Sequence, residues 1–238
     1  PHPAEPAEDP RKAVEDALEA PAGDFSWAAL ASRGPAGRRR GAAGLTVAIA
    51  VNDKTRPVPH EHLLPPLLAR LEGAGIRRED ITLIVATGTH PPMTPDEFPQ
   101  ILPQEIISRY RVVSHDAEDK GILREVGTTS RGTPLLLNRL FLDADVRIVI
   151  GNIEPHQFMG FSGGVKSAVI GLAAKETINQ NHAMMSLPEA LPGRYEDNPP
   201  RQDVEEMGEM VRIDLAVNAI LNDKKEIIEV TAGVPAAV

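Results

Sequence analysis

The residues best suited to proton transfer in this chain of 238 residues are histidines that follow short apolar runs. His90, His115 and His156 each come soon after such a run, and His182 lies further along the chain. An imidazole titrates near neutral pH, so it can accept or donate a proton under physiological conditions. A single histidine in a loop is more often structural than catalytic. Several histidines at one edge of a sheet would instead favour a site of proton transfer.

A second kind of chemistry is indicated by Asp53 and Arg56, in the segment Asn-Asp-Lys-Thr-Arg-Pro that follows the first apolar run. Two interpretations are open. The two side chains could form a local ion pair that fixes a turn. Alternatively, the planar guanidinium of Arg56 could bind a carboxylate or phosphate group of a ligand.

Residues 160–167, Gly-Phe-Ser-Gly-Gly-Val-Lys-Ser, match a phosphate-binding loop only in part. A Walker loop requires a glycine directly before its lysine, and Val165 occupies that position, which disfavours a phosphate-loop nucleotide enzyme. Backbone N–H groups of Gly163 and Gly164 at the start of a helix could still bind an anion. We therefore expect a phosphorylated ligand there, with Lys166 beside it. The alternative for Lys166 is a surface lysine without a ligand.

The apolar pattern predicts the elements that would position these residues. Short β-branched runs predict strands at residues 45–51, 81–86, 111–114, 146–150, 213–221 and 226–230. Helical periodicity predicts helices at residues 11–19, 60–72, 96–110 and 134–142. This alternation is typical of an α/β, Rossmann-like fold whose mostly parallel sheet has helices on both faces, with the late strands open to an antiparallel arrangement.

Ligands of such sheets bind beyond the carboxyl ends of the strands, where the polar segments described above begin. We therefore expect these segments to line one site. Residues 11–238 are predicted to form one α/β domain, and residues 1–10, rich in proline and acidic residues, a poorly ordered tail. Three consecutive arginines at 38–40 are interpreted as the solvated entry to a strand, with an anion-binding patch as the alternative.

Composition excludes several classes of function. The chain has 25 Lys and Arg against 34 Asp and Glu, a formal net charge of −9, and few aromatic residues, which disfavours nucleic-acid binding. It contains no cysteine, so thiolate metal sites and thiol nucleophiles are absent, and a cytoplasmic location is expected. No apolar run approaches the length of a membrane span, so no membrane partner is expected. His2, His60 and His62 are expected at the surface.

Taken together, the polar motifs give the chain a resemblance to the N-terminal domain of the nickel-dependent lactate racemase family. The matching motifs are Asp-Lys-Thr-Arg-Pro at 53–57, Gly-Thr-His at 88–90, the run from Glu154 through Lys166 to His182, and Asp-Val-Glu-Glu at 203–206. Their order and the intervals between residues 53 and 182 agree with the family. The resemblance covers residues 11–233.

The resemblance implies a nickel pincer nucleotide as the cofactor, a pyridinium mononucleotide whose sulfur and carbon atoms hold nickel. Lys166 would be its covalent attachment point, and His182 would be the protein ligand to the metal. Gly163 and Gly164 would belong to the cofactor-binding segment. Enzymes of cofactor biosynthesis would then be partners of this protein.

The same resemblance implies a racemase or epimerase that acts on a small 2-hydroxy acid. His90 and His156 would be the acid/base pair, Arg56 would bind the substrate carboxylate, and Asp53 would support the same region. Hydride transfer to a pyridinium avoids a carbanion at a very weak carbon acid and leaves a transient 2-keto acid. Two bases on opposite sides are expected because both enantiomers are substrates.

Geometry adds one expectation. Lys166 and His182 are sixteen residues apart, about 24 Å along a continuous helix, yet both must reach one small cofactor. The chain must therefore turn back between them, and Gly171 is the obvious break. We predict an interruption of the helix at residues 171–174.

Two features depart from the family pattern. Lys54 stands where a small or apolar residue is expected and would place an extra cation beside the carboxylate site. The family has a second, C-terminal domain that closes over the substrate, and we expect this chain to carry only the cofactor half of the site, without that domain, and to be inactive alone. The alternative function is a non-catalytic nickel- or nucleotide-binding module, which would have no need for two catalytic histidines.

Overall fold

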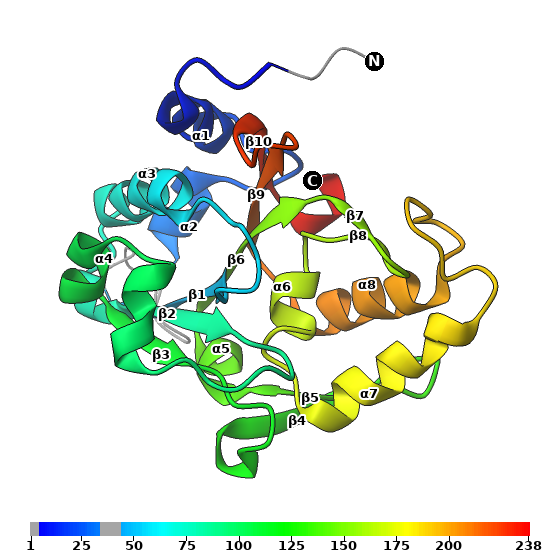
Figure 1. The fold of residues 1–238 in the computed structure, drawn as a ribbon. Coiled ribbons are helices and arrows are strands. Elements are labelled where there is room, and N and C mark those ends of the chain that lie inside the picture. Colours follow the sequence, from blue (N-terminus) through cyan, green and yellow to red (C-terminus); the bar gives the residue numbers. More distant parts are fainter. Residues whose placement is uncertain (1–4, 34–43) are drawn as a thin grey trace.

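A computed structural model of the chain describes residues 5–33 and 44–238, which are organised around a six-stranded sheet (Figure 1). In spatial order the strands are β10 (Ile227–Gly233), β9 (Leu215–Leu221), β6 (Val146–Ile153), β1 (Val47–Asn52), β2 (Ile81–Ala86) and β3 (Arg111–Ser114). The strands from β9 to β3 are parallel, and β10 pairs antiparallel with β9. The predicted α/β fold with a mostly parallel sheet is therefore confirmed.

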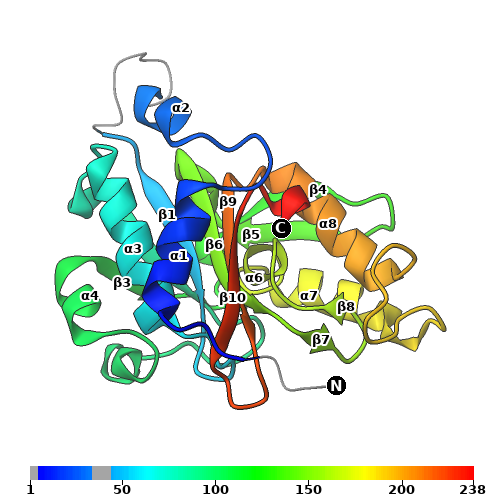
Figure 2. The ribbon, with the colours of Figure 1, turned by 90° about the horizontal axis from the view of Figure 1, so that it is seen from above.

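Helices cover both faces of the sheet (Figure 2). One face carries α1 (Pro10–Glu19), α2 (Trp27–Ser32), α3 (His60–Gly73) and α4 (Gln104–Arg109). The other carries α5 (Arg139–Asp143), α6 (Lys166–Val169), α7 (Lys175–Ala183) and α8 (Pro199–Val211). Short 3₁₀ turns occur at Arg78–Asp80, Pro95–Gln100, Lys120–Ile122, Met184–Ser186 and Pro235–Ala237.

Strand β1 shows how the sequence separates the two faces. Ile49 and Val51 belong to the core under α1 and α3, whereas Ala48 and Ala50 belong to the core under α6 and α8. Side chains alternate along a strand, so these residues are assigned to opposite faces by their spacing alone. The alanines present small side chains on the face where the short helix α6 packs.

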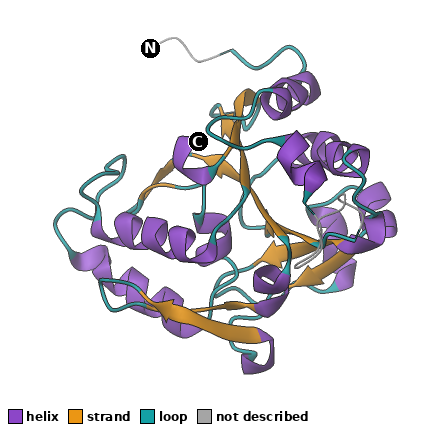
Figure 3. Ribbon diagram, turned by 180° about the vertical axis from the view of Figure 1, so that it is seen from behind, coloured by secondary structure: helices purple, strands orange, loops and turns teal. Residues whose placement is uncertain are grey.

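The prediction of a helix at residues 134–142 is wrong over its first half. Residues Pro134–Asn138 form β5, which pairs antiparallel with β4 (Leu123–Thr128), and only Arg139–Asp143 are helical. Leu135 and Leu137 are buried while Pro134 and Leu136 are only half-buried, which is the period of a strand. The hairpin lies at the outer edge of the molecule beside α7 (Figure 3).

The helix predicted at residues 96–110 is divided. Pro95–Gln100 form a 3₁₀ turn, and α4 begins only at Gln104, directly after Pro103. Proline lacks the N–H that a helix interior requires, so Pro99 and Pro103 account for the division. The predicted surface position of His60 is also wrong. Its side chain is 1% exposed, and burial lowers its pKa to about 4.

Two of the sequence predictions concern residues that lie outside the described part of the chain. They are the poorly ordered tail, of which residues 1–4 are not described, and the three arginines at 38–40. Within the rest of the tail, the backbone N–H of Ala7 donates to the carbonyl of Ile227 at 2.8 Å. Among the described helices, none has both the length and the apolar composition needed to cross a membrane.

Candidate active site

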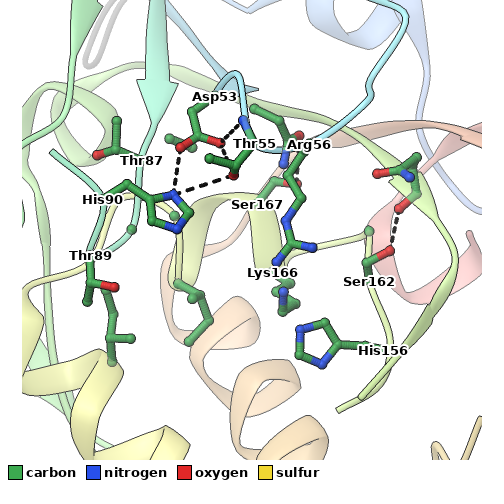
Figure 4. A pocket seen from close by; sticks show the side chains of 18 of the residues that line it. Asp53, Thr55, Arg56, Thr87, Thr89, His90, His156, Ser162, Lys166 and Ser167 are labelled. Atoms are coloured by element: carbon green, nitrogen blue, oxygen red, sulfur yellow. Dashed lines mark hydrogen bonds and ion pairs between the residues drawn. The ribbon is translucent and has the colours of Figure 1, made fainter. Parts of the chain in front are cut away.

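A cavity of about 540 Å³ lies beyond the carboxyl ends of β1, β2 and β6, at the edge of the sheet where the polar segments begin (Figure 4). Seven of the eight residues that the sequence assigned to a site line this cavity. They are Asp53, Arg56, His90, His156, Gly163, Lys166 and His182. The parallel strands thus bring together segments that are up to 129 positions apart in the sequence, from 53 to 182.

His90 is held by Asp53, which is 3% exposed at the end of β1. The His90 Nδ1–H donates to Asp53 Oδ2 at 2.7 Å. The other carboxylate oxygen accepts the backbone N–H of Thr55 at 3.1 Å and the Thr55 hydroxyl at 2.6 Å. An aspartate that binds Nδ1–H fixes the ring so that Nε2 carries the lone pair. The expected support of the site by Asp53 therefore takes the form of a bond to His90.

Arg56 forms no ion pair with Asp53, because the carboxylate is engaged by Thr55 and His90. The two residues are joined through the backbone instead, where the Arg56 N–H donates to the Asp53 carbonyl at 3.1 Å. This turn directs the Arg56 guanidinium toward Lys166 and His156 (Figure 4). Of the two interpretations of Arg56, the structure favours a guanidinium offered to a ligand.

His156 lies on the far side of Arg56 and Lys166 from His90 (Figure 4). Its Nδ1 accepts the backbone N–H of Met159 at 3.3 Å, so the neutral ring carries its proton on Nε2. Burial, followed by the charges of Lys166 and Arg56, lowers the pKa of His156 to about 3. His156 is therefore neutral at physiological pH.

Phe158 separates His156 from His182. The ring centroids of His156 and Phe158 are 4.9 Å apart, and those of Phe158 and His182 are 5.1 Å apart, both in edge-to-face geometry. Burial, and then the charge of Lys166, lowers the pKa of His182 to about 4. The lone pair of this neutral imidazole is available to a metal ion.

Lys166 is the first residue of α6 and is largely enclosed by the cavity. Burial, followed by the charges of Arg56 and Arg201, lowers its pKa to about 7, although the Glu154 carboxylate acts in the opposite direction. A large fraction of this amine is therefore unprotonated at neutral pH. An unprotonated amine is nucleophilic, whereas an ordinary surface lysine is not.

The predicted interruption between Lys166 and His182 is confirmed. Helix α6 ends at Val169 and α7 begins at Lys175, and both helices contribute a side chain to the cavity. A Cβ atom on Gly171 would lie 2.3 Å from the Ser167 carbonyl oxygen, so only glycine fits at this bend.

His115 does not line the cavity, but its side chain forms a hydrogen bond with the backbone of this bend. It is 0% exposed, and its Nε2 lies 3.0 Å from the carbonyl oxygen of Ala173. Its Nδ1 lies 3.2 Å from the amide nitrogen of Asn138, which is an N–H donor. These partners require a neutral ring, and burial lowers the pKa of His115 accordingly.

Two expectations are corrected. The N–H of Gly164 donates to Asn218 Oδ1 at 3.1 Å, and Gly164 does not line the cavity, so only Gly163 of the pair is placed to meet a ligand. The helix that follows has four residues, too short to present a strong N-terminal dipole. Lys54 pairs with Glu97 and is absent from the lining, so it adds no cation to the carboxylate site.

Sequence reasoning missed several residues of the site. Phe158, one of only five phenylalanines, lies inside the run from Glu154 to Lys166 that carries the resemblance, and that position was the available signal. Arg201 contributes positive charge from α8 and donates to the Phe161 carbonyl at 3.0 Å. No local pattern distinguishes Arg201 from other arginines, because its proximity to the cavity depends on how α8 packs.

The described part of the chain does not assemble a metal site from its own side chains. Within residues 5–33 and 44–238, no three His, Asp or Glu side chains lie together as a ligand set. Of the cavity's histidines, His182 offers a neutral imidazole beside the unprotonated amine of Lys166. A metal held there would need most of its donor atoms from another molecule.

Comparisons with known proteins show the family of the chain. A family model described as the lactate racemase N-terminal domain matches residues 1–191. Proteins named lactate racemase from Lactiplantibacillus plantarum and Thermoanaerobacterium thermosaccharolyticum are 32% and 30% identical over 189 residues. Each match covers 79% of this chain and 44% of the relative, so the chain spans about half the length of these relatives.

The fold is shared with solved structures. The lactate racemase apoprotein from Thermoanaerobacterium thermosaccharolyticum matches with a TM-score of 0.85 at 28% identity, over 98% of this chain and 54% of that one. A protein from Thermotoga maritima has the same fold, with a TM-score of 0.69 at 23% identity, over 94% of this chain and 53% of that one. The chain therefore belongs to the lactate racemase N-terminal domain family.

Proposed function

We propose that this chain is the cofactor-binding, N-terminal part of a racemase or epimerase of 2-hydroxy acids that uses a nickel pincer nucleotide. The proposal includes a cytoplasmic location and cofactor biosynthesis enzymes as partners. It is supported by membership of the lactate racemase N-terminal domain family and by the chemistry of the cavity. The chain spans about half of its relatives, so the complete activity belongs to a longer protein.

The residues present fit such a cofactor. The amine of Lys166, with its pKa lowered to about 7, is suited to a covalent bond with a carboxyl-derived group. His182 offers a neutral imidazole from a second helix, as a single protein ligand to nickel requires. When bound, the cofactor would supply reversible hydride acceptance, the chemistry that inversion of the α carbon by way of a 2-keto acid requires.

The chain's own side chains then bind and orient the substrate. The guanidinium of Arg56 forms a bidentate pair with the substrate carboxylate and holds it while the α carbon is inverted. The cationic surroundings that lower the pKa of Lys166 and His156 favour an anionic substrate at the same place.

The two histidines begin from opposite tautomers. His90 has its proton on Nδ1, bound by Asp53, so its Nε2 lone pair accepts the substrate hydroxyl proton. His156 receives the Met159 N–H at Nδ1, so its Nε2–H donates a hydrogen bond to the substrate oxygen on the other side, and it can give up a proton only after Nδ1 has been protonated. To accept the hydroxyl proton of the opposite enantiomer, His156 must release the Met159 N–H and carry its own proton on Nδ1, and His90 must hold the proton that it then donates.

The placement of His90 and His156 on two sides of Arg56 and Lys166 is the observation that carries the proposal (Figure 4). A racemase needs a proton acceptor for each enantiomer. A module that only stores or delivers nickel or a nucleotide needs neither His90 nor the aspartate that orients it. The alternative function is therefore disfavoured by this pair.

The test begins with the cofactor. After co-expression with the cofactor-making enzymes, intact-mass analysis should show an adduct that is lost in Lys166→Ala, together with bound nickel. Absence of both the adduct and nickel from the wild-type protein would refute the proposal. An adduct with nickel, but without racemisation by the complete protein, would favour the carrier module.

The roles of the histidines are tested in the complete protein. His90→Ala and His156→Ala should each reduce racemisation by at least about 100-fold, the lower range for loss of a general acid or base. His62→Ala, on α3 and outside the cavity lining, is the control and should retain the wild-type rate. Wild-type rates in both cavity variants would contradict the acid/base assignment.

A further inference from the structure

The side-chain amide of Asn181 is buried next to the ring of His182. The side chain of Asn181 is 0% exposed, and its Nδ2 donates to the Pro200 carbonyl at 3.0 Å and to Asp203 Oδ2 at 2.8 Å. Both partners are acceptors without a proton to give. A flipped amide would place its oxygen against two other oxygens, so the orientation of Asn181 is determined by its surroundings.

Asp203 is itself fixed by the β4–β5 hairpin. Its Oδ1 accepts the hydroxyl of Thr129 at 2.6 Å, and its Oδ2 accepts the hydroxyl of Thr133 at 2.8 Å. The carboxylate is 0% exposed and its hydrogen bonds come from neutral donors. Asp203 belongs to the Asp-Val-Glu-Glu motif, for which the sequence suggested no role.

The amide oxygen of Asn181 faces His182. Its Oδ1 lies 3.2 Å from His182 Nδ1, and an amide oxygen can only accept a hydrogen bond. The ring must therefore supply the proton from Nδ1, which leaves the lone pair on Nε2. In metal sites, a ligating histidine is commonly fixed in this way by a hydrogen bond to its other nitrogen.

We propose that Asn181, oriented by Asp203, holds His182 in the Nδ1–H tautomer and so reserves Nε2 for a metal ion in the cavity. The identity of that metal rests on the proposed function, but the tautomer does not. Asn181 and Asp203 are thus positioning residues. Through them, the β4–β5 hairpin and α8 determine which nitrogen of His182 carries the lone pair.

The tautomer can be measured without cofactor or metal. In the ¹⁵N-histidine-labelled protein at pH 7.5, long-range ¹H–¹⁵N correlation reports separately on Nδ1 and Nε2, and His182→Gln assigns the signal. Wild-type His182 should show a protonated Nδ1 and an unprotonated Nε2. Asn181→Ala should shift the population toward Nε2–H, and Asp203→Asn, which permits the Asn181 amide to flip, should cause an intermediate shift.

Thr177→Val is the matched control for a structural effect. Thr177 is buried on the same helix, and its hydroxyl donates to the Pro134 carbonyl at 2.6 Å, but it forms no hydrogen bond with His182. This variant should keep the wild-type tautomer even if it lowers stability. An Nε2–H tautomer in the wild-type protein, an unchanged tautomer in Asn181→Ala, or an equal shift in Thr177→Val would overturn the proposal.

A second readout separates this proposal from the proposed function. In protein loaded with the cofactor, Asn181→Ala should keep the Lys166 adduct by intact mass but bind nickel about 10–100-fold more weakly. Unchanged nickel affinity would overturn the link between the tautomer and the metal. A wild-type protein with neither adduct nor nickel would instead refute the proposed function, while the tautomer measurement would still decide the role of Asn181.

Discussion

The strongest prediction of the structure concerns the amine of Lys166. Its enclosure in the cavity removes water from the charged form, and Arg56 and Arg201 repel that charge, so its pKa falls from 10.5 to about 7. At pH 7 about half of the amine is unprotonated, against roughly 0.03% for an ordinary lysine. The reactive fraction of Lys166 should therefore be roughly a thousandfold larger.

Competitive labelling with trace acetic anhydride, followed by mass spectrometry of the peptides, measures this fraction as a function of pH. The labelling of Lys166 should rise to a plateau with a midpoint near pH 7. Lys175 is the internal control, because its contact with Glu118 raises its pKa above the usual value. In Arg56→Gln the Lys166 midpoint should move upward, because a neighbouring positive charge has been removed.

The result that would refute this reasoning is a Lys166 midpoint near pH 10 in the wild-type protein. Such a midpoint would mean that water reaches the ammonium group and that Arg56 is too distant or too well screened to affect it. A midpoint near pH 7 that does not move in Arg56→Gln would leave burial as the cause and remove Arg56 from the explanation.

Three further predictions follow from individual contacts. Gly171→Ala places a Cβ 2.3 Å from the Ser167 carbonyl oxygen and should lower the unfolding free energy in urea by about 1–3 kcal/mol. Because the folded pKa of His156 is about 3 against 6.5 for an unperturbed histidine, the unfolded state binds more protons below pH 6.5, and stability should fall from there toward pH 3. His156→Asn should make this fall in thermal stability less steep. Lys54→Ala breaks a solvent-exposed ion pair with Glu97, so the midpoint of thermal unfolding should hardly change, and the midpoint pH of Lys166 labelling should be unchanged.

Each of these has a control. A Cβ on Gly73, at the end of α3, would meet nothing within 4 Å, so Gly73→Ala should cause no loss of stability. His62→Asn, outside the cavity, should leave the acid limb of the stability profile unchanged. Equal losses of stability in Gly171→Ala and Gly73→Ala would contradict the argument about the bend. Equal acid profiles in His156→Asn and His62→Asn would contradict the argument about the His156 pKa. An altered Lys166 midpoint in Lys54→Ala would contradict the placement of Lys54 outside the site.

The sequence predicted the central strands well because they are short, β-branched and buried on both faces. It also predicted the bend at Gly171, since two residues that must reach one ligand cannot lie sixteen positions apart on a single helix. It failed at residues 134–138, where three consecutive leucines fit a helix and a strand equally well. Only the pairing of β5 with β4 selects the strand.

The sequence by itself determined which residue types stand at the carboxyl ends of the strands, and therefore most of the cavity lining. It did not determine which charges meet there. The lowered pKa of Lys166 depends first on burial and then on the charges of Arg56 and Arg201, and Arg201 approaches only when α8 packs on α6. Likewise, the hydrogen bond from Asn181 to Asp203 joins residues 22 positions apart. Spacing along a strand or helix is a local property, whereas burial and the orientation of a hydrogen bond depend on groups that only tertiary packing brings together.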